Sequence, residues 1–165
     1  GGNFAAVRDW MLRYPYSCLE QKTSIAISTE DAAAWQWVAN SMAAYLDRDG
    51  LARYFATDRL EGDDSLTAYL LRISQAAGRE IPEATRERML KGLEDFVAGR
   101  VRRYGSIESA DLAVRKMAAI DALAPVSVVT LDQIQGRQAT TLGGLLYNIP
   151  GVWTQDRGDE PSYCG

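Results

Sequence analysis

The chain has 165 residues, a hydrophobic fraction of 47% and a charged fraction of 24%, values typical of one globular domain with its own core. Its formal charge is -4, and no long basic block is present, which argues against a nucleic-acid partner. Histidine is absent, which excludes His-dependent metal sites and Ser–His or Cys–His catalysis. Any covalent chemistry must therefore use Cys, Lys, Tyr or carboxylates.

The two cysteines, Cys18 and Cys164, stand far apart, and such a pair does not predict a disulfide framework. No apolar run reaches the length of a membrane span. The first residues, Gly1 to Asn3, lack the charged and apolar regions of a signal peptide. We interpret this start as that of a piece cut from a longer protein.

The first part of the chain predicts two helices separated by a turn. Residues 4–13 read as a short helix, and Pro15 disfavours helix at the residue before it. We therefore expect a turn over 14–17 and a helix from Leu19 to about Ser28.

A strongly amphipathic helix follows, for which Thr29 is the expected N-cap, with Glu30 and Asp31 in its first turn. Its end is predicted over 47–50, with Gly50 in a left-handed conformation. One of the two tryptophans on this helix is expected in the core and the other at its edge. The predicted apolar face consists of Trp35, Val38, Met42, Tyr45 and Leu46.

Three further helices are predicted over 63–78, 82–99 and 108–123, with Pro82 as the first helical residue of the second. Because short loops join them, we expect antiparallel helical hairpins. Their apolar faces are, in chain order, Leu66, Tyr69, Leu70 and Ile73; Met89, Leu93, Phe96 and Val97; and Ala113, Met117, Ile120 and Ala124.

The character of the sequence changes at Pro125, which predicts a domain boundary between 1–124 and 125–165. Residues 126–130 are β-branched and predict a strand, and two short helices are expected over 131–135 and 141–147. The fold class is thus mainly α, followed by a short strand-helix-helix appendage and a loose tail.

The segment YPYSCLEQKTS, residues 14–24, resembles the thioester segment of bacterial α2-macroglobulins, commonly written YPYGCLEQ. Ser17 stands where glycine is usual. The resemblance implies that Cys18 and Gln21 are the two ends of an internal thioester, flanked by Ser17, Leu19 and Glu20.

The spacing fits this chemistry, because one helical turn brings side chains at i and i+3 together. The Cys18 sulfur displaces ammonia from the Gln21 amide, and the resulting activated acyl group reacts with lysine amines of another protein. Water also attacks a thioester, so the bond must be shielded. Tyr14 and Tyr16 are the local candidates for that shield.

The resemblance to this family covers most of residues 10–124. It implies an incomplete α/α toroid, a periplasmic or outer-envelope location, and a protease-trapping inhibitor that is not a turnover enzyme. Its partners would be target proteases, held covalently through their lysines, and possible cell-envelope proteins; no metal and no cofactor are implied. The similar stretches beyond the thioester segment are 45–55, 64–71, 81–89 and 110–116.

Two other resemblances in the sequence point to different functions. Residues 125–152 resemble the start of a TonB-dependent receptor plug, mainly through 139–142 and 148–152; this predicts a transport-gating segment, or a fused chain with no function of its own. Asp63 and Asp64 resemble the metal-binding aspartates of α/α-barrel terpenoid synthases, but the third acid of that motif is missing. A helix N-terminus is the simpler role for these two acids.

Overall fold

The structure, a computed structural model, describes residues 9, 13–14, 17–101 and 110–125. These residues form a mainly helical fold, as the sequence predicts. Within them, the only β-contacts are isolated bridges from Ala52 to Leu46 and to Asp63. The elements are α2 (Leu19–Ser28), α3 (Ala32–Ser41), the 3-10 helix η1 (Met42–Tyr45), α4 (Asp64–Ala76), α5 (Glu83–Val97) and α6 (Ala110–Leu123).

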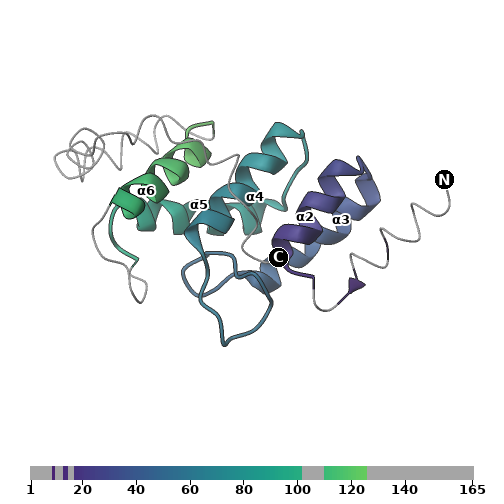
Figure 1. The fold of residues 1–165 in the computed structure, drawn as a ribbon, viewed down its shortest axis with the longest axis horizontal. Helices are drawn as coiled ribbons and strands as arrows, with labels where there is room; N and C mark the ends of the chain where they lie inside the picture. Colours follow the sequence, from purple (N-terminus) through teal and green to yellow (C-terminus); the bar gives the residue numbers. More distant parts are fainter. Residues whose placement is uncertain (1–8, 10–12, 15–16, 102–109, 126–165) are drawn as a thin grey trace.

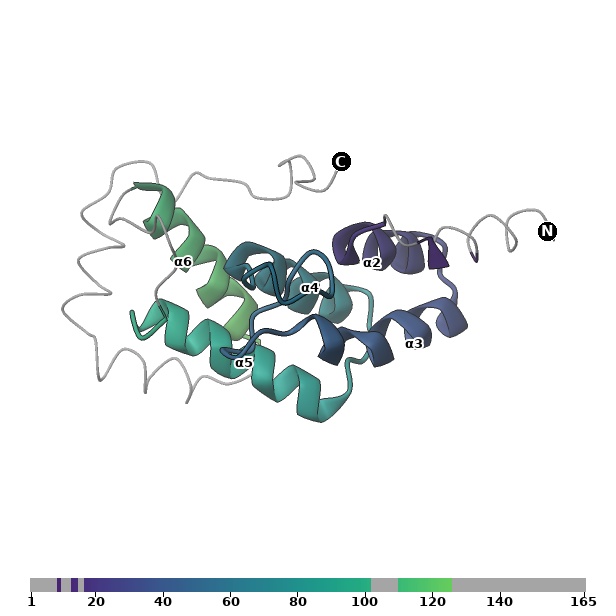
Figure 2. The ribbon, with the colours of Figure 1, turned by 90° about the horizontal axis from the view of Figure 1, so that it is seen from below.

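The five α-helices are arranged in two layers (Figure 1). Helix α4 packs against both α2 and α6, so that α2, α4 and α6 form one layer. Helix α3 packs against α2, and α5 packs against α4 and α6, so that α3 and α5 form the second layer; Figure 2 shows the two rows from below. Alternate helices along the chain therefore lie in the same layer.

The boundary between α2 and α3 lies two residues later than the sequence predicts. Thr29 is the C-cap of α2, and Glu30 ends the turn with a φ of 54°. Asp31 is the N-cap of α3, and its carboxylate accepts a hydrogen bond from the Ala34 N–H at 2.9 Å. The Thr29 prediction is wrong because its hydroxyl bonds back to the Ile25 carbonyl at 2.7 Å and so belongs to the preceding helix.

The observed ends of α4 and α5 agree more closely with those predicted from the sequence. Asp63 is the N-cap of α4 and accepts from the Leu66 N–H at 2.7 Å, and Gly78 follows the helix with a φ of 65°. Pro82 is the N-cap of α5 and not its first helical residue, since the helix begins at Glu83. Gly99 ends this hairpin with a φ of 78°.

The core lies between the two layers and contains most of the predicted apolar faces. On α3 and η1 the prediction is confirmed, with Trp35 buried and Trp37 exposed. On α6 it is partly wrong: Ala113 is buried, but Ala124 is exposed and the buried stripe runs through Leu112, Ala119 and Leu123.

A buried ion pair joins α4 to α6. Arg115 donates from Nη2 and Nε to the two carboxylate oxygens of Asp64, at 2.6 and 3.1 Å. Its guanidinium also lies 5.5 Å from the centre of the Phe96 ring, on α5. The Asp64 hydrogen bonds raise the pKa of Arg115 despite the opposing effect of burial. The pair thus ties three helices together at one end of the molecule.

Several predictions lie largely or wholly outside the described residues. Only Asp9 and Arg13 of the predicted helix over 4–13 are described, and both are helical. The appendage over 126–165, with its plug resemblance, is not described. Among the helices of the described part, none is long and apolar enough to cross a membrane.

Candidate functional site

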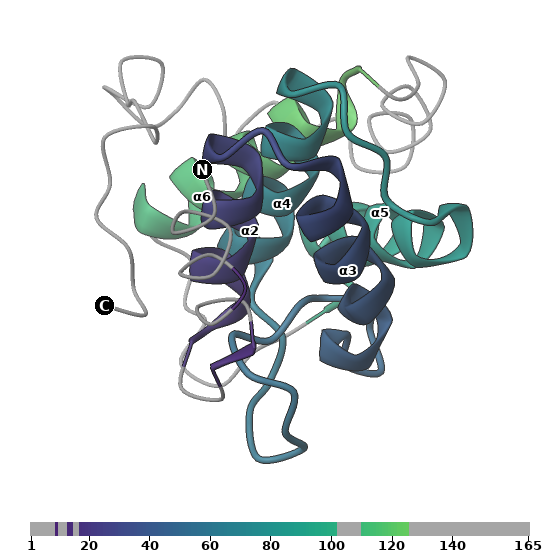
Figure 3. The same ribbon diagram turned by 90° about the vertical axis from the view of Figure 1, so that its right-hand side faces the viewer.

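Cys18 is the residue that begins α2. It lies in the extended conformation of an N-cap, with φ -80° and ψ 166°, and its side chain is fully buried. The preceding turn forms as predicted, because the Ser17 N–H donates to the Tyr14 carbonyl at 3.1 Å. This turn leads into the N-terminal end of α2, the lower end of that helix in Figure 3.

Cys18 and Gln21 contact each other reciprocally. The Gln21 N–H donates to the Cys18 sulfur at 3.4 Å, and the Cys18 N–H donates to Gln21 Oε1 at 3.2 Å. Together these contacts form a capping box, in which the N-cap and the residue three positions later satisfy each other's backbone donors. The side-chain amide of Gln21 is thereby folded back toward the residue that carries the sulfur.

The sulfur itself is in a disulfide bond, whose other half lies outside the described residues. The spacing of the cysteines does not predict this bond. The predicted thioester would use the same sulfur, so Cys18 cannot carry it while the disulfide is intact. The disulfide must be reduced before any acyl chemistry at this position.

The other predicted residues of the motif have different surroundings. Ser17 and Leu19 are buried, and Glu20 is partly exposed in the first turn of α2. Tyr14 is 36% exposed, and Tyr16 lies outside the described residues. The shielding role expected of these two tyrosines stays a prediction.

A backbone contact that sequence reasoning missed lies next to the sulfur. The Leu19 N–H, the first of α2, donates to the Tyr54 carbonyl at 2.8 Å. Tyr54 belongs to the loop between η1 and α4, which lies beside the N-terminal end of α2 in all three views (Figures 1–3). Because the contact uses only main-chain atoms, no residue type in the sequence signals it.

Lys22 is a buried amine one residue after Gln21. Its Nζ donates to the Tyr45 hydroxyl at 3.3 Å and lies 5.7 Å from the centre of the Trp37 ring. Both contacts are on η1 and α3, so the Lys22 ammonium is held on the α3 side of α2. The Tyr45 hydroxyl and the Trp37 ring therefore occupy this amine on that side of the helix.

Thr23 carries a buried hydroxyl in the same helix. Its side chain is fully buried, and among the described residues its Oγ1 has no hydrogen-bond partner. An unsatisfied buried hydroxyl costs about 1–3 kcal/mol. The helix that carries Cys18 and Gln21 is thus not optimised for stability at this position.

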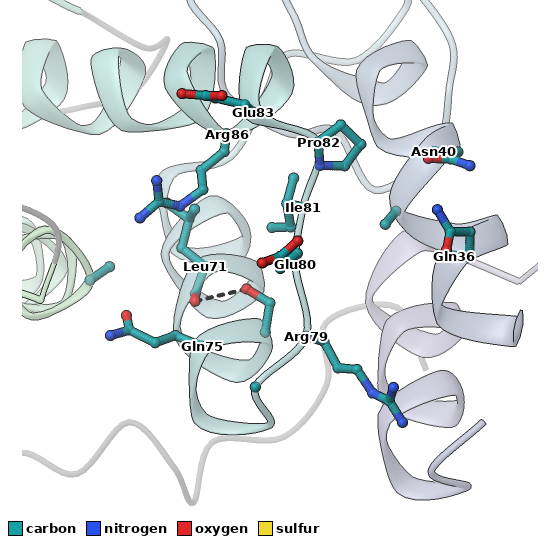
Figure 4. Close-up of a pocket in the computed structure, with 14 residues that line it drawn as sticks. Gln36, Asn40, Leu71, Gln75, Arg79, Glu80, Ile81, Pro82, Glu83 and Arg86 are labelled. Carbon is teal, nitrogen blue, oxygen red and sulfur yellow. Dashed lines mark hydrogen bonds between the residues drawn. The ribbon is translucent and has the colours of Figure 1, made fainter. Parts of the chain in front are cut away.

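A surface hollow of about 860 Å³ lies elsewhere, between α3, the end of α4 and the start of α5. Figure 4 shows the extended segment 79–82 running through it, with Gln36 and Asn40 on one side and Arg86 on the other. Neither Cys18 nor Gln21 lines it. Its lining mixes amides, both signs of charge and a few apolar side chains, and no group of metal ligands is present there.

The two acids at the start of α4 act structurally. Asp63 caps the helix, and burial raises the pKa of its carboxyl although the hydrogen bond from Leu66 N–H opposes the change. Asp64 is paired with Arg115. No group of three or more His, Cys, Asp or Glu side chains that fits a metal ion occurs among the residues described.

No protein-family model matches the chain, and neither a curated protein nor a solved structure matches it. Functional inference therefore rests on the residues around Cys18 and on the arrangement of the helices.

Proposed function

We propose that the chain is a covalent trapping module of the α2-macroglobulin type, in which Cys18 and Gln21 form an internal thioester. The observation that carries this proposal is the reciprocal contact of the two residues at the start of α2. The resemblance of residues 14–24 to the thioester segment supports it. A serine or aspartate caps a helix as well or better, so capping alone does not explain a cysteine at this position.

The chemistry begins with reduction of the disulfide by a dithiol, which leaves Cys18 as a thiol. Its sulfur attacks the side-chain carbonyl carbon of Gln21, the carbon–nitrogen bond breaks, and the amide nitrogen leaves as ammonia with the thiol proton. The Cys18 N–H, which already donates to Gln21 Oε1, is placed to stabilise negative charge that develops on that oxygen.

Capture is the second step. An amine of another protein attacks the acyl carbon, an amide bond forms, and Cys18 is released as a thiol. Lys22 is the amine nearest in sequence, and its contacts with Tyr45 and Trp37 hold it away from this role. The expected targets are lysines of proteases in the periplasm or outer envelope, trapped once per molecule and not turned over.

The helix arrangement supports the incomplete α/α toroid that this proposal includes. In a toroid, alternate helices along the chain form an inner row and the helices between them an outer row. Contacts of α4 with α2 and α6, and of α3 and α5 with that row, follow this plan. The thioester would lie at the end of the inner row where α2 begins.

Intact-mass measurement on the reduced protein tests the proposal, with and without methylamine. We expect a deficit of one ammonia before treatment, and addition of one methylamine with release of the Cys18 thiol afterwards. The matched control is Gln21→Glu, which keeps an oxygen acceptor for the Cys18 N–H but has no ammonia to lose, and it should show neither change. A reduced protein of full mass, with Cys18 open to alkylation after unfolding and no methylamine adduct, would refute the thioester.

A structural role for Cys18 is the second candidate, which the disulfide favours. In that case the reduced protein keeps its full mass, and reduction lowers its stability. A removed disulfide typically costs about 2–5 kcal/mol. Urea unfolding with and without reductant, beside the mass measurement, therefore separates the two candidates.

A further inference from the structure

The loop over residues 46–63, called here the Asp47 loop, is built around one buried carboxylate. Asp47 is 3% exposed. Its Oδ1 accepts from the N–H groups of Asp49 and Leu51 at 2.9 and 3.1 Å, and its Oδ2 accepts from the Gly62 N–H at 2.8 Å. Both ends of the loop are thus held by the same side chain.

Further contacts stiffen the middle of this loop. The Ala52 N–H donates to the Thr67 hydroxyl of α4 at 2.8 Å. Arg53 donates from its backbone N–H to the Tyr45 carbonyl at 2.8 Å and from its guanidinium to the Leu60 and Leu46 carbonyls. The residue after Arg53 is Tyr54, so its carbonyl is placed by this network.

The loop is also fixed on α5. Arg88 donates to the Asp47 carbonyl at 3.1 Å. Gly50, with a φ of 85°, and Gly92 of α5 allow the two backbones to approach closely, because an added Cβ at Gly92 would lie 2.6 Å from the Asp49 carbonyl oxygen. The loop therefore connects α5 to the N-terminal end of α2.

We infer that Asp47 is a positioning residue for the Cys18–Gln21 site, acting through the Tyr54 carbonyl and its hydrogen bond with the Leu19 N–H. Leu19 is covalently next to Cys18, so this bond fixes the first turn of α2 and with it the contact of Cys18 N–H with Gln21 Oε1. When the loop loosens, that turn frays, the acyl group loses its alignment, and water gains access. This inference deepens the proposed function and rests on it.

The substitution that tests it is Asp47→Asn. An asparagine has one oxygen and one NH₂ group, so in either orientation a donor faces at least one of the three backbone N–H groups. Asp95→Asn is the matched control, because Asp95 also accepts charged hydrogen bonds, from Lys91 and Arg100 at 2.9 and 2.8 Å, but lies on α5. It removes a hydrogen-bonded carboxylate whose partners are exposed charged side chains, without removing a contact of the Asp47 loop.

Two readouts separate positioning from the thioester itself. In the reduced Gln21→Glu chain, which cannot form a thioester, alkylation of Cys18 followed on its own peptide reports only how well the sulfur is covered. We expect Asp47→Asn to speed this alkylation about tenfold, since a weakened buried hydrogen bond shifts local opening by about that factor. Deuterium exchange of the Leu19 amide should accelerate similarly, while the amides of α5 should not change.

In the chain that retains Gln21, Asp47→Asn should speed hydrolysis of the thioester by a similar factor. If no thioester forms there, the proposed function fails, whereas the alkylation and exchange results still decide whether Asp47 positions Cys18. Equal effects of Asp47→Asn and Asp95→Asn, or no effect of either, would overturn the inference. If Asp47→Asn does not fold, Arg53→Gln, which removes the guanidinium contacts with the Leu60 and Leu46 carbonyls of the same loop, takes its place with the same expected outcome.

Discussion

Replacement of Asp64 by asparagine should destabilise the fold by about 2–3 kcal/mol. Removing one partner of a fully buried pair costs about 3–5 kcal/mol, because the other charge is left unpaired. Here the Arg115 side chain keeps 22% exposure and has Asp111 at 3.5 Å, while Asp64 is 3% exposed. Partial solvation of the guanidinium and this second carboxylate lower the expected cost from the fully buried value.

Urea unfolding followed by circular dichroism measures this change. Asp111→Asn is the control, because its carboxylate is 74% exposed and an exposed pair contributes at most about 1 kcal/mol. A double-mutant cycle with Arg115→Met isolates the pair from the effect of Asp64 on the helix dipole. A coupling energy near zero, or equal losses for Asp64→Asn and Asp111→Asn, would show that the ion pair does not hold α6 on α4.

Three smaller changes test other parts of the fold. Thr23→Val should raise the free energy of unfolding by about 1 kcal/mol, because it removes a buried hydroxyl without a partner; a loss in the same urea experiment would mean that the hydroxyl is satisfied. Gly50→Ala should cost clearly more than Gly99→Ala, since both have positive φ but only a Cβ at Gly50 would lie 2.2 Å from the Arg88 carbonyl oxygen; equal losses would contradict the close approach of the loop to α5. Asp63→Asn should stabilise the protein at neutral pH, because burial raises the pKa of Asp63 above 3.8 and the folded state then binds the proton more tightly than the unfolded state. The wild type gains stability as the pH falls through the raised pKa toward 3.8, so the advantage of the variant should shrink over that window and would not do so if Asp63 were unperturbed.

Helix α2 begins at the expected Leu19 and ends at Ser28, close to the expected end, because the signals for its start are local. The turn closed by the Ser17 N–H and the Cys18 N-cap precede it. The start of α3 is less clearly encoded by nearby residues, because Thr29, Glu30 and Asp31 all suit a helix N-terminus. Which of them becomes the N-cap depends on the left-handed backbone of Glu30. A positive φ at a glutamate is not readable from residue type.

The buried stripe of α6 illustrates a second limit. Both the predicted stripe through Ala113 and Met117 and the observed one through Leu112 and Ala119 satisfy helical spacing. The observed rotation of α6 also places Arg115 against Asp64 of α4. A contact between residues 51 positions apart cannot be derived from the period of a single helix.

The spacing of Cys18 and Gln21 could be predicted from the sequence, but the contacts that hold this turn in place could not. Three residues of separation bring two side chains to one turn whatever the rest of the fold. In contrast, the contact with the Tyr54 carbonyl is made by backbone atoms, which no residue type in the sequence signals. The Asp47 loop that holds this carbonyl lies about 30 residues further along the chain. What surrounds the sulfur is therefore a property of the tertiary structure.

The capping box also bears on how the proposed thioester would fit the start of α2. In the structure the divalent sulfur of the disulfide accepts the Gln21 N–H at 3.4 Å, and the sulfur of a thioester would be divalent as well. The second contact, from Cys18 N–H to Gln21 Oε1, would keep its acceptor because the oxygen stays on the acyl carbon. The proposed thioester would thus leave an acceptor for each of the two backbone N–H groups of the cap. A disulfide at the same sulfur leaves both contacts and blocks the chemistry, so reduction of Cys18 is the step on which the proposed reaction depends.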